Sequence, residues 1–219
     1  MVRLLLIGPP GVGKGTQGAR LSQRLGVPSV STGDLLRRLI ASGVDTPLVR
    51  GAREIEKGAF VSDDFANRLA LAELNKPAAA AGFILDGYPR SVPQAETLEA
   101  FLAGVGLGIE AVLVFSITPE ELGMRLRGRR VCAVCGATYH VAAAPPMVEG
   151  RCDRCAGALV PRVEDNQPEK IALRQELYES QTTPLISFYE GRGLVKIISA
   201  EGTPGMVFAR ICEALEILV

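Results

Sequence analysis

Residues 8–16 of this chain, GPPGVGKGT, follow directly on the apolar run VRLLLI and precede a stretch of helix-forming residues. The backbone N–H groups of such a glycine-rich turn, with the positive end of the following helix, surround one point and suit a polyphosphate. Lys14 adds a full positive charge there. Strand, loop and helix in this order predict a phosphate-binding loop in an α/β fold.

The residue after the lysine departs from the general pattern of this loop. The usual serine or threonine binds Mg²⁺ through its hydroxyl, whereas here Gly15 takes that place and Thr16 follows. We therefore expect Mg²⁺ to be held through water molecules by carboxylates, as it often is in proteins. The acidic candidates are Asp34 and Asp86, and Asp34 also suits a helix N-cap.

Five short apolar or β-branched runs alternate with helical patterns along the chain. They lie at residues 2–7, 28–31, 83–86, 111–117 and 194–199. The alternation predicts an α/β fold, with a five-stranded parallel sheet flanked by helices. Open sheets of this kind bind ligands at the carboxyl ends of their strands, which is where Arg90 is expected.

One helix has clear boundary signals. Thr118 suits the N-cap, Pro119 the first helical position and Glu121 the capping box. The helix is expected to run towards Arg129. Arg125 and Arg129 are four residues apart on it, and therefore share one face.

The length of 219 residues suits one core with small insertions. Two segments interrupt the α/β pattern, and the second has several glycines and no helical period. We expect a P-loop core at 1–30, 62–126 and 165–219, a helical lobe at 31–61, and an inserted small β lid at 127–164.

Four of the five cysteines form two CxxC pairs separated by 16 residues. This spacing predicts a structural four-thiolate zinc site in the lid, although iron or cobalt would fit four thiolates as well. The alternatives are two disulfides or unrelated buried thiols. The ligands are Cys132, Cys135, Cys152 and Cys155. His140 is not needed as a ligand and is interpreted as a polar residue of a small hairpin. Cys212 is interpreted as a buried core thiol.

Charge is balanced, with 24 Lys and Arg against 24 Asp and Glu, so no global field attracts nucleic acid or membranes. No apolar run approaches the roughly 20 residues of a membrane-spanning helix. The amino terminus has no secretory h-region. We expect a cytoplasmic protein with neither nucleic acid nor membrane as partner.

Five segments together resemble the nucleoside monophosphate kinases, above all the adenylate kinase family. They are GPPGVGKGT (8–16), STGDLLR (31–37), DGYPRSVPQ (86–94), RLRGRRVC (125–132) and QTTPLISFY (181–189). They come in the family's order and at about its spacing, so the resemblance covers essentially the whole chain. It implies reversible, Mg²⁺-dependent phosphoryl transfer from ATP to AMP giving two ADP, by a monomer whose lid closes over ATP and whose lobe binds AMP.

Such a transfer needs positioning and charge neutralisation more than covalent chemistry, and arginine pairs well with phosphate oxygens. The resemblance implies catalytic roles for Lys14, Arg90, Arg129, Arg162 and Arg174. It implies ATP contacts for Gly11, Val12, Gly13, Lys14, Gly15, Thr16, Arg125, Arg129, Thr138, Tyr139 and Pro204. It implies AMP contacts for Thr32, Arg37, Ala59, Phe60, Val61, Gly87, Tyr88, Pro89, Arg90, Gln94, Arg162 and Arg174.

The chain departs from the family pattern between Arg162 and Arg174, where it is one residue longer, with Gln167 the expected insertion. The relative phase of the two arginines is therefore open.

Rival enzymes are a UMP or CMP kinase, a kinase using GTP, and a P-loop kinase of other metabolites. A rival of another class is a nucleic-acid-binding zinc ribbon with ATPase activity, against which the neutral charge and the lack of interleaved aromatic residues argue.

Overall fold

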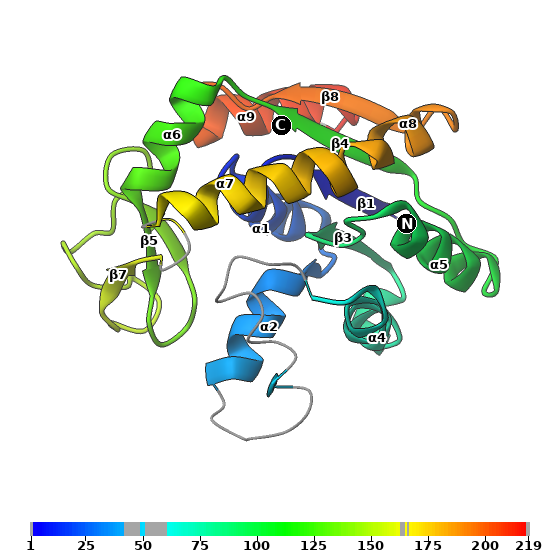
Figure 1. Ribbon diagram of the computed structural model, residues 1–219, viewed down its shortest axis with the longest axis horizontal. Helices are drawn as coiled ribbons and strands as arrows, with labels where there is room; N and C mark the ends of the chain where they lie inside the picture. Colours follow the sequence, from blue (N-terminus) through cyan, green and yellow to red (C-terminus); the bar gives the residue numbers. More distant parts are fainter. Residues whose placement is uncertain (1, 42–48, 51–60, 163–164, 166, 218–219) are drawn as a thin grey trace.

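The computed structural model describes residues 2–41, 49–50, 61–162, 165 and 167–217. Its centre is a five-stranded parallel sheet in the order β2-β3-β1-β4-β8 (Figure 1). The strands are β1 (Val2–Ile7), β2 (Ser29–Ser31), β3 (Gly82–Asp86), β4 (Ala111–Ser116) and β8 (Val195–Ser199). All five strands predicted from the apolar runs are confirmed, and so is the α/β fold class.

Helices cover both faces of this sheet, which explains why its strands are continuously apolar. The helices α1 (Lys14–Leu25) and α9 (Pro204–Ala214) pack on the face to which Leu4 and Leu6 of β1 point. On the face of Leu5 and Ile7 lie the helices α4 (Asp63–Leu74), α5 (Val92–Ala103) and α8 (Pro184–Glu190). Cys212 on α9 is fully buried, so its interpretation as a core thiol is confirmed.

A second, antiparallel sheet of three strands stands apart from the first (Figure 1). Its strands are β5 (Arg129–Cys132), β6 (Thr138–His140) and β7 (Leu159–Pro161), in the order β6-β5-β7. The chain enters this sheet from α6 (Pro119–Gly128) and leaves it towards α7 (Pro168–Leu177). A π-helical turn, η4 (Tyr178–Thr182), joins α7 to α8. His140 lies in the hairpin that the sequence predicted.

Two details of α6 differ from the prediction. The helix ends at Gly128, so Arg129 begins strand β5 and does not share a helical face with Arg125. The Thr118 hydroxyl caps the helix by accepting from the Glu121 N–H at 3.4 Å, as predicted. The Glu121 carboxylate, however, does not complete a capping box. It accepts hydrogen bonds from Arg125 and from the Gly202 N–H.

The described part of the predicted lobe consists of Ser31, α2 (Thr32–Ala41), residues 49–50 and residue 61. Leu36 of α2 packs on Phe65 of α4, which connects α2 to the core. The Ser31 hydroxyl accepts from the Asp34 N–H at 3.4 Å, so Ser31 caps α2 and Asp34 lies in its first turn. The alanine run after α4 contains a short 3₁₀ turn, η2 (Pro77–Ala79). Within the described ranges no helix has the length and apolar character needed to cross a bilayer.

Candidate active site

A pocket of about 230 Å³ lies at the carboxyl edge of the parallel sheet, between the core and the small antiparallel sheet. Most of the residues expected in the site line it. They are Gly11, Val12, Gly13, Lys14, Gly15, Thr16, Asp34, Arg37, Asp86, Gly87, Pro89, Arg90, Arg125, Arg129, Thr138, Tyr139, Arg162, Arg174 and Pro204. These residues come from segments distributed over most of the chain, and the fold brings them together at one place.

The phosphate-binding loop begins α1 with Gly13 in the left-handed region, at φ 109°. An L side chain rarely adopts this conformation, so glycine is needed there. Next to it, the Lys14 Nζ donates to the carbonyls of Gly8 at 2.6 Å and Pro9 at 3.1 Å. Burial, partly offset by Asp86, lowers the pKa of Lys14 to about 8. The lysine is thus held over the loop as a desolvated cation.

The position of Asp86 bears on the missing hydroxyl at Gly15. A Cβ atom at Gly15 would lie 3.5 Å from the Asp86 Oδ2 atom, so the carboxylate stands beside the place where a serine or threonine would begin. Burial raises the pKa of Asp86. The positive charge of Lys14 acts against this rise, and the negative charge of Asp34 adds to it. Two carboxylates that repel one another beside a phosphate loop form a donor set that fits Mg²⁺.

Arg90 is fixed by the turn that follows β3. Its side-chain Nε donates to the Gly87 carbonyl at 2.8 Å, and its backbone N–H donates to the Gln94 side-chain oxygen at 2.7 Å. The Thr182 hydroxyl donates to the Arg90 carbonyl at 3.0 Å. Burial, opposed by Asp86, lowers the pKa of Arg90 to about 10. The guanidinium therefore enters the pocket from a rigid support.

Arg129 and Arg174 meet at one carboxylate, that of Asp165. Arg129 donates to both oxygens of Asp165, at 2.5 and 2.6 Å, and Arg174 donates to one of them at 2.9 Å. Only 1% of the Asp165 side chain is exposed. Burial alone would raise the pKa of Asp165, but the hydrogen bonds and charge of Arg129, with Arg174 and Arg162, lower it.

Arg162 and Arg174 both line the pocket. Arg174 lies on α7, and Gln167, the residue expected to be an insertion, stands at the N-cap of that helix. That Gln167 is an insertion stays a prediction.

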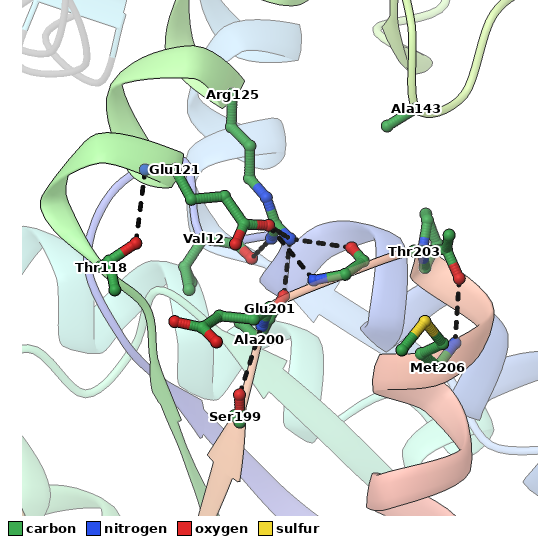
Figure 2. A network of polar contacts seen from close by, with 12 residues as sticks. Val12, Thr118, Glu121, Arg125, Ala143, Ser199, Ala200, Glu201, Thr203 and Met206 are labelled. Carbon is green, nitrogen blue, oxygen red and sulfur yellow. Dashed lines mark hydrogen bonds and ion pairs between the residues drawn. The ribbon is translucent and has the colours of Figure 1, made fainter.

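Arg125 lies on the other side of the loop, among backbone carbonyls (Figure 2). It donates to the Val12 carbonyl at 2.8 Å and to the Ala200 carbonyl at 2.6 Å. Pro204 lines the pocket beside it, and its carbonyl accepts from the Gln17 side-chain amide at 3.0 Å.

Several residues expected in the acceptor site do not line the pocket. Thr32 is buried and donates to the Gly87 carbonyl at 2.8 Å. The Gln94 amide is buried and donates to Asp63 at 2.6 Å. Tyr88 is buried as well, and Val61 lies just before Ser62, the N-cap of α4. Ala59 and Phe60 lie outside the described residues.

Sequence reasoning missed other residues of the site. His140, Tyr178, Thr182 and Gln17 line the pocket, and Asp165 organises two of its arginines. For Thr182 the matching segment at 181–189 was a signal, since it belongs to the same resemblance. For Asp165 the available signal was its position, since it is an acidic residue only three positions after Arg162 and could have been expected to pair with an arginine.

The four predicted metal ligands lie together in the small sheet. The Sγ atoms of Cys132, Cys135, Cys152 and Cys155 are all within 4.8 Å of one another, and none of them is in a disulfide. The Tyr139 hydroxyl lies 3.4 Å from the Cys152 Sγ, and this hydrogen bond lowers the pKa of Cys152 to about 6. A tetrahedral ion with metal–sulfur bonds of about 2.3 Å fits such a cluster.

Comparison with known proteins gives a consistent result. The profile of a family described as adenylate kinase matches residues 6–194. An adenylate kinase of Symbiobacterium thermophilum is 46% identical over 215 residues, which cover 98% of this chain and 98% of the relative. Those of Carboxydothermus hydrogenoformans and Geobacter sp. strain M21 are 43% and 44% identical, over 98% of this chain and 100% and 99% of their own lengths.

Proposed function

Because this chain belongs to the adenylate kinase family, we propose that it transfers the terminal phosphoryl group of ATP to AMP, reversibly, giving two ADP. The observation that supports this most is the convergence of seven cations in one pocket at the carboxyl edge of the sheet. They are Lys14, Arg37, Arg90, Arg125, Arg129, Arg162 and Arg174.

The chemistry asks little covalent work of the protein. The acceptor oxygen of AMP is already anionic, so no general base is needed, and catalysis depends on in-line positioning and charge neutralisation. We assign the phosphates of ATP to Lys14 and Arg129, and the phosphate of AMP to Arg37 and Arg90. Arg162 and Arg174 enter from α7 and its preceding segment, where they neutralise the group in transfer.

The nucleosides bind on either side of these cations. The adenine of ATP is assigned to Arg125, Thr138, Tyr139 and the backbone of Pro204, and the backbone of residues 11–16 wraps its phosphates. The adenine of AMP is assigned to Thr32, Gln94 and residues 59–61, next to the turn 87–89. The buried Gln94 amide retains one donor hydrogen and one acceptor lone pair for an adenine edge.

Two ions are part of the proposal. Asp34 and Asp86 hold Mg²⁺ through water molecules, and the ion neutralises charge on the phosphates. Cys132, Cys135, Cys152 and Cys155 hold Zn²⁺, which stabilises a sheet whose small buried cluster includes two of these cysteines.

The division of the chain follows from these assignments. The core (1–30, 62–126 and 165–219) binds the phosphates, the lobe (31–61) binds AMP, and the lid (127–164) covers ATP. Closure of the lid would exclude water, which would otherwise accept the phosphoryl group.

We further propose that the protein is cytoplasmic, since cysteine thiols that bind a metal suit a reducing compartment. We also propose that it is a monomer. Light scattering of the purified protein measures its molar mass, and a monomer should give 23.2 kDa.

The reaction is tested by incubating the protein with Mg²⁺ and ADP alone and separating the nucleotides by ion-exchange chromatography. ATP and AMP are expected in equal amounts. Repeating the assay with ATP and AMP, CMP, UMP or GMP, and with GTP and AMP, measures base choice at each site. Failure to convert ADP while ATP phosphorylates UMP or CMP would overturn the assignment of AMP as acceptor.

A further inference from the structure

The guanidinium of Arg125 is surrounded by acceptors (Figure 2). Its Nη1 donates to the Val12 carbonyl at 2.8 Å. Its Nη2 donates to the carbonyls of Ala200 at 2.6 Å and Gly202 at 3.1 Å, and to the Glu121 carboxylate at 2.6 Å. These acceptors come from the phosphate loop, from the loop between β8 and α9, and from α6. One cation therefore connects three parts of the pocket wall.

The Glu121 carboxylate has a second role in this network. The same Oε1 atom that binds Arg125 accepts from the Gly202 N–H at 3.3 Å. The carboxylate thus fixes the guanidinium and the backbone of residues 200–202 at once. The side chains of Glu121 and Arg125 are only 24% and 19% exposed, so solvent screens this pair less than an ordinary surface pair of charges.

This arrangement determines what Arg125 has left for a ligand. The five N–H bonds of a guanidinium lie in its plane, and here the protein acceptors engage Nη2 fully and Nη1 once. Two in-plane N–H bonds and the flat face are left, and such a face stacks well on an aromatic ring. Ala143 and Ala144, which follow β6, line the same pocket. The region around Arg125 therefore suits a planar base better than a phosphate.

We propose that Glu121 is a positioning residue for the donor nucleotide, which orients the face of Arg125 and fixes the loop 200–202 as the wall against which the purine of ATP lies. This inference rests on the proposed function only in naming ATP as the donor. It predicts that Glu121 acts on binding of the base and leaves binding of the phosphates to Lys14 and the other arginines.

The test compares ATP with inorganic tripolyphosphate, which has the phosphates and no base. Isothermal titration calorimetry measures both dissociation constants for the full chain and for Glu121→Ala. We expect the dissociation constant of ATP to rise about tenfold, as for loss of a charged hydrogen bond. That of tripolyphosphate should stay within about twofold. Glu121→Gln keeps an acceptor oxygen, and we expect an intermediate effect on ATP.

Glu120→Ala is the matched control, because Glu120 is exposed in the same turn of α6 and its loss changes the net charge equally. It should leave both dissociation constants unchanged. Equal weakening of ATP and tripolyphosphate, an effect of Glu120→Ala as large as that of Glu121→Ala, or unchanged ATP binding in Glu121→Ala would each overturn the proposal. If Glu121→Ala does not fold, the ratio of the two constants in Glu121→Gln decides instead.

The outcome is separable from that of the proposed reaction. A wild-type protein that binds ATP but does not convert ADP would contradict the proposed function and leave the Glu121 comparison intact. A wild-type protein that converts ADP but binds ATP no more tightly than tripolyphosphate would contradict the base-binding wall alone.

Discussion

The Asp165 carboxylate holds the Arg129 guanidinium through two parallel hydrogen bonds, 2.5 Å to Nε and 2.6 Å to Nη2. Arg174 binds the same carboxylate at 2.9 Å, and the charge of Arg162 also acts on it. Three arginines expected to contact phosphates therefore act on one buried anion. The carboxylate offsets their mutual repulsion, and it sets the positions of Arg129 and Arg174 before a substrate arrives.

Replacing Asp165 by alanine should destabilise the protein strongly, because it leaves guanidinium groups close together without a counter-charge. Breaking a buried pair from one side costs about 3–5 kcal/mol, which predicts a fall of at least about 6 °C in the midpoint of thermal unfolding. Differential scanning calorimetry measures it. Asp64→Ala is the control, since the pair of Asp64 with Arg68 is exposed and should contribute little.

The stabilisation by Asp165 should also depend on pH. Its pKa is lower in the folded protein than the ordinary value of 3.8, so its contribution is complete above that value and is lost as the pH falls through the folded-state pKa. The difference in unfolding midpoint between wild type and Asp165→Asn should be constant from about pH 7 to 5 and shrink below about pH 4. A difference that grows on acidification would contradict the assigned direction of the shift.

The lowered pKa of Lys14 predicts that ATP binding weakens at alkaline pH. Its pKa of about 8 means that it is charged below pH 8 and becomes neutral above it, so the dissociation constant of ATP should rise between about pH 8 and 9. Arg90 and Arg129, with pKa values of about 10, stay charged in this range. Lys14→Arg, which remains charged, should flatten the profile, and an equally steep profile in that variant would exclude Lys14 as the titrating group.

Removing one ligand should weaken the metal site without disturbing the core. Cys152→Ser is expected to lower bound zinc from about one ion per chain and to lower the melting temperature of the small sheet. Plasma emission spectrometry measures the metal, and far-ultraviolet circular dichroism follows unfolding. Cys212→Ser, at a buried thiol of α9, should keep full zinc content. Undiminished zinc in Cys152→Ser would contradict the four-thiolate assignment.

Gly128 is expected to tolerate no side chain. A Cβ atom there would lie 2.3 Å from the His140 Nε2, so Gly128→Ala must displace the ring at the junction of α6 and the small sheet. Overpacking of this kind costs about 1–3 kcal/mol, measurable by chemical denaturation. Adding His140→Ala should restore most of the loss. Gly123→Ala on the same helix has its nearest contact at 3.5 Å and should be neutral or stabilising by up to about 1 kcal/mol. A loss in Gly128→Ala that His140→Ala does not relieve would contradict the clash.

The sequence predicted the parallel sheet and the phosphate loop because both depend on local patterns. Strand β1 and the start of α1 follow from an apolar run and a glycine-rich turn, and both are found at the expected residues. The cluster of four cysteines could be predicted as well, since the CxxC spacing brings the two members of each pair together. The resemblance to a family located most of the residues that line the pocket.

The contacts between distant elements were not predictable in this way. Glu121 reads locally as a helix-capping residue, yet its carboxylate bonds with Gly202, 81 positions later. Asp165 is 36 positions from Arg129, and only the fold brings the two together. The end of α6 was also misjudged, because Arg129 is extended and pairs with His140 in the small sheet, and helical periodicity contains no information on that pairing.

Strand β1, the first to be synthesised, lies in the middle of the sheet, with Val2 paired to Gly82 and Leu4 to Ala111. On the ribosome, the segment that forms the phosphate loop must therefore wait for β3 and β4 to emerge before its supporting strand has both neighbours. Nascent chains that end before β4 should not retain nucleotide. The order of synthesis thus delays completion of the sheet around β1 until about half of the protein has left the exit tunnel.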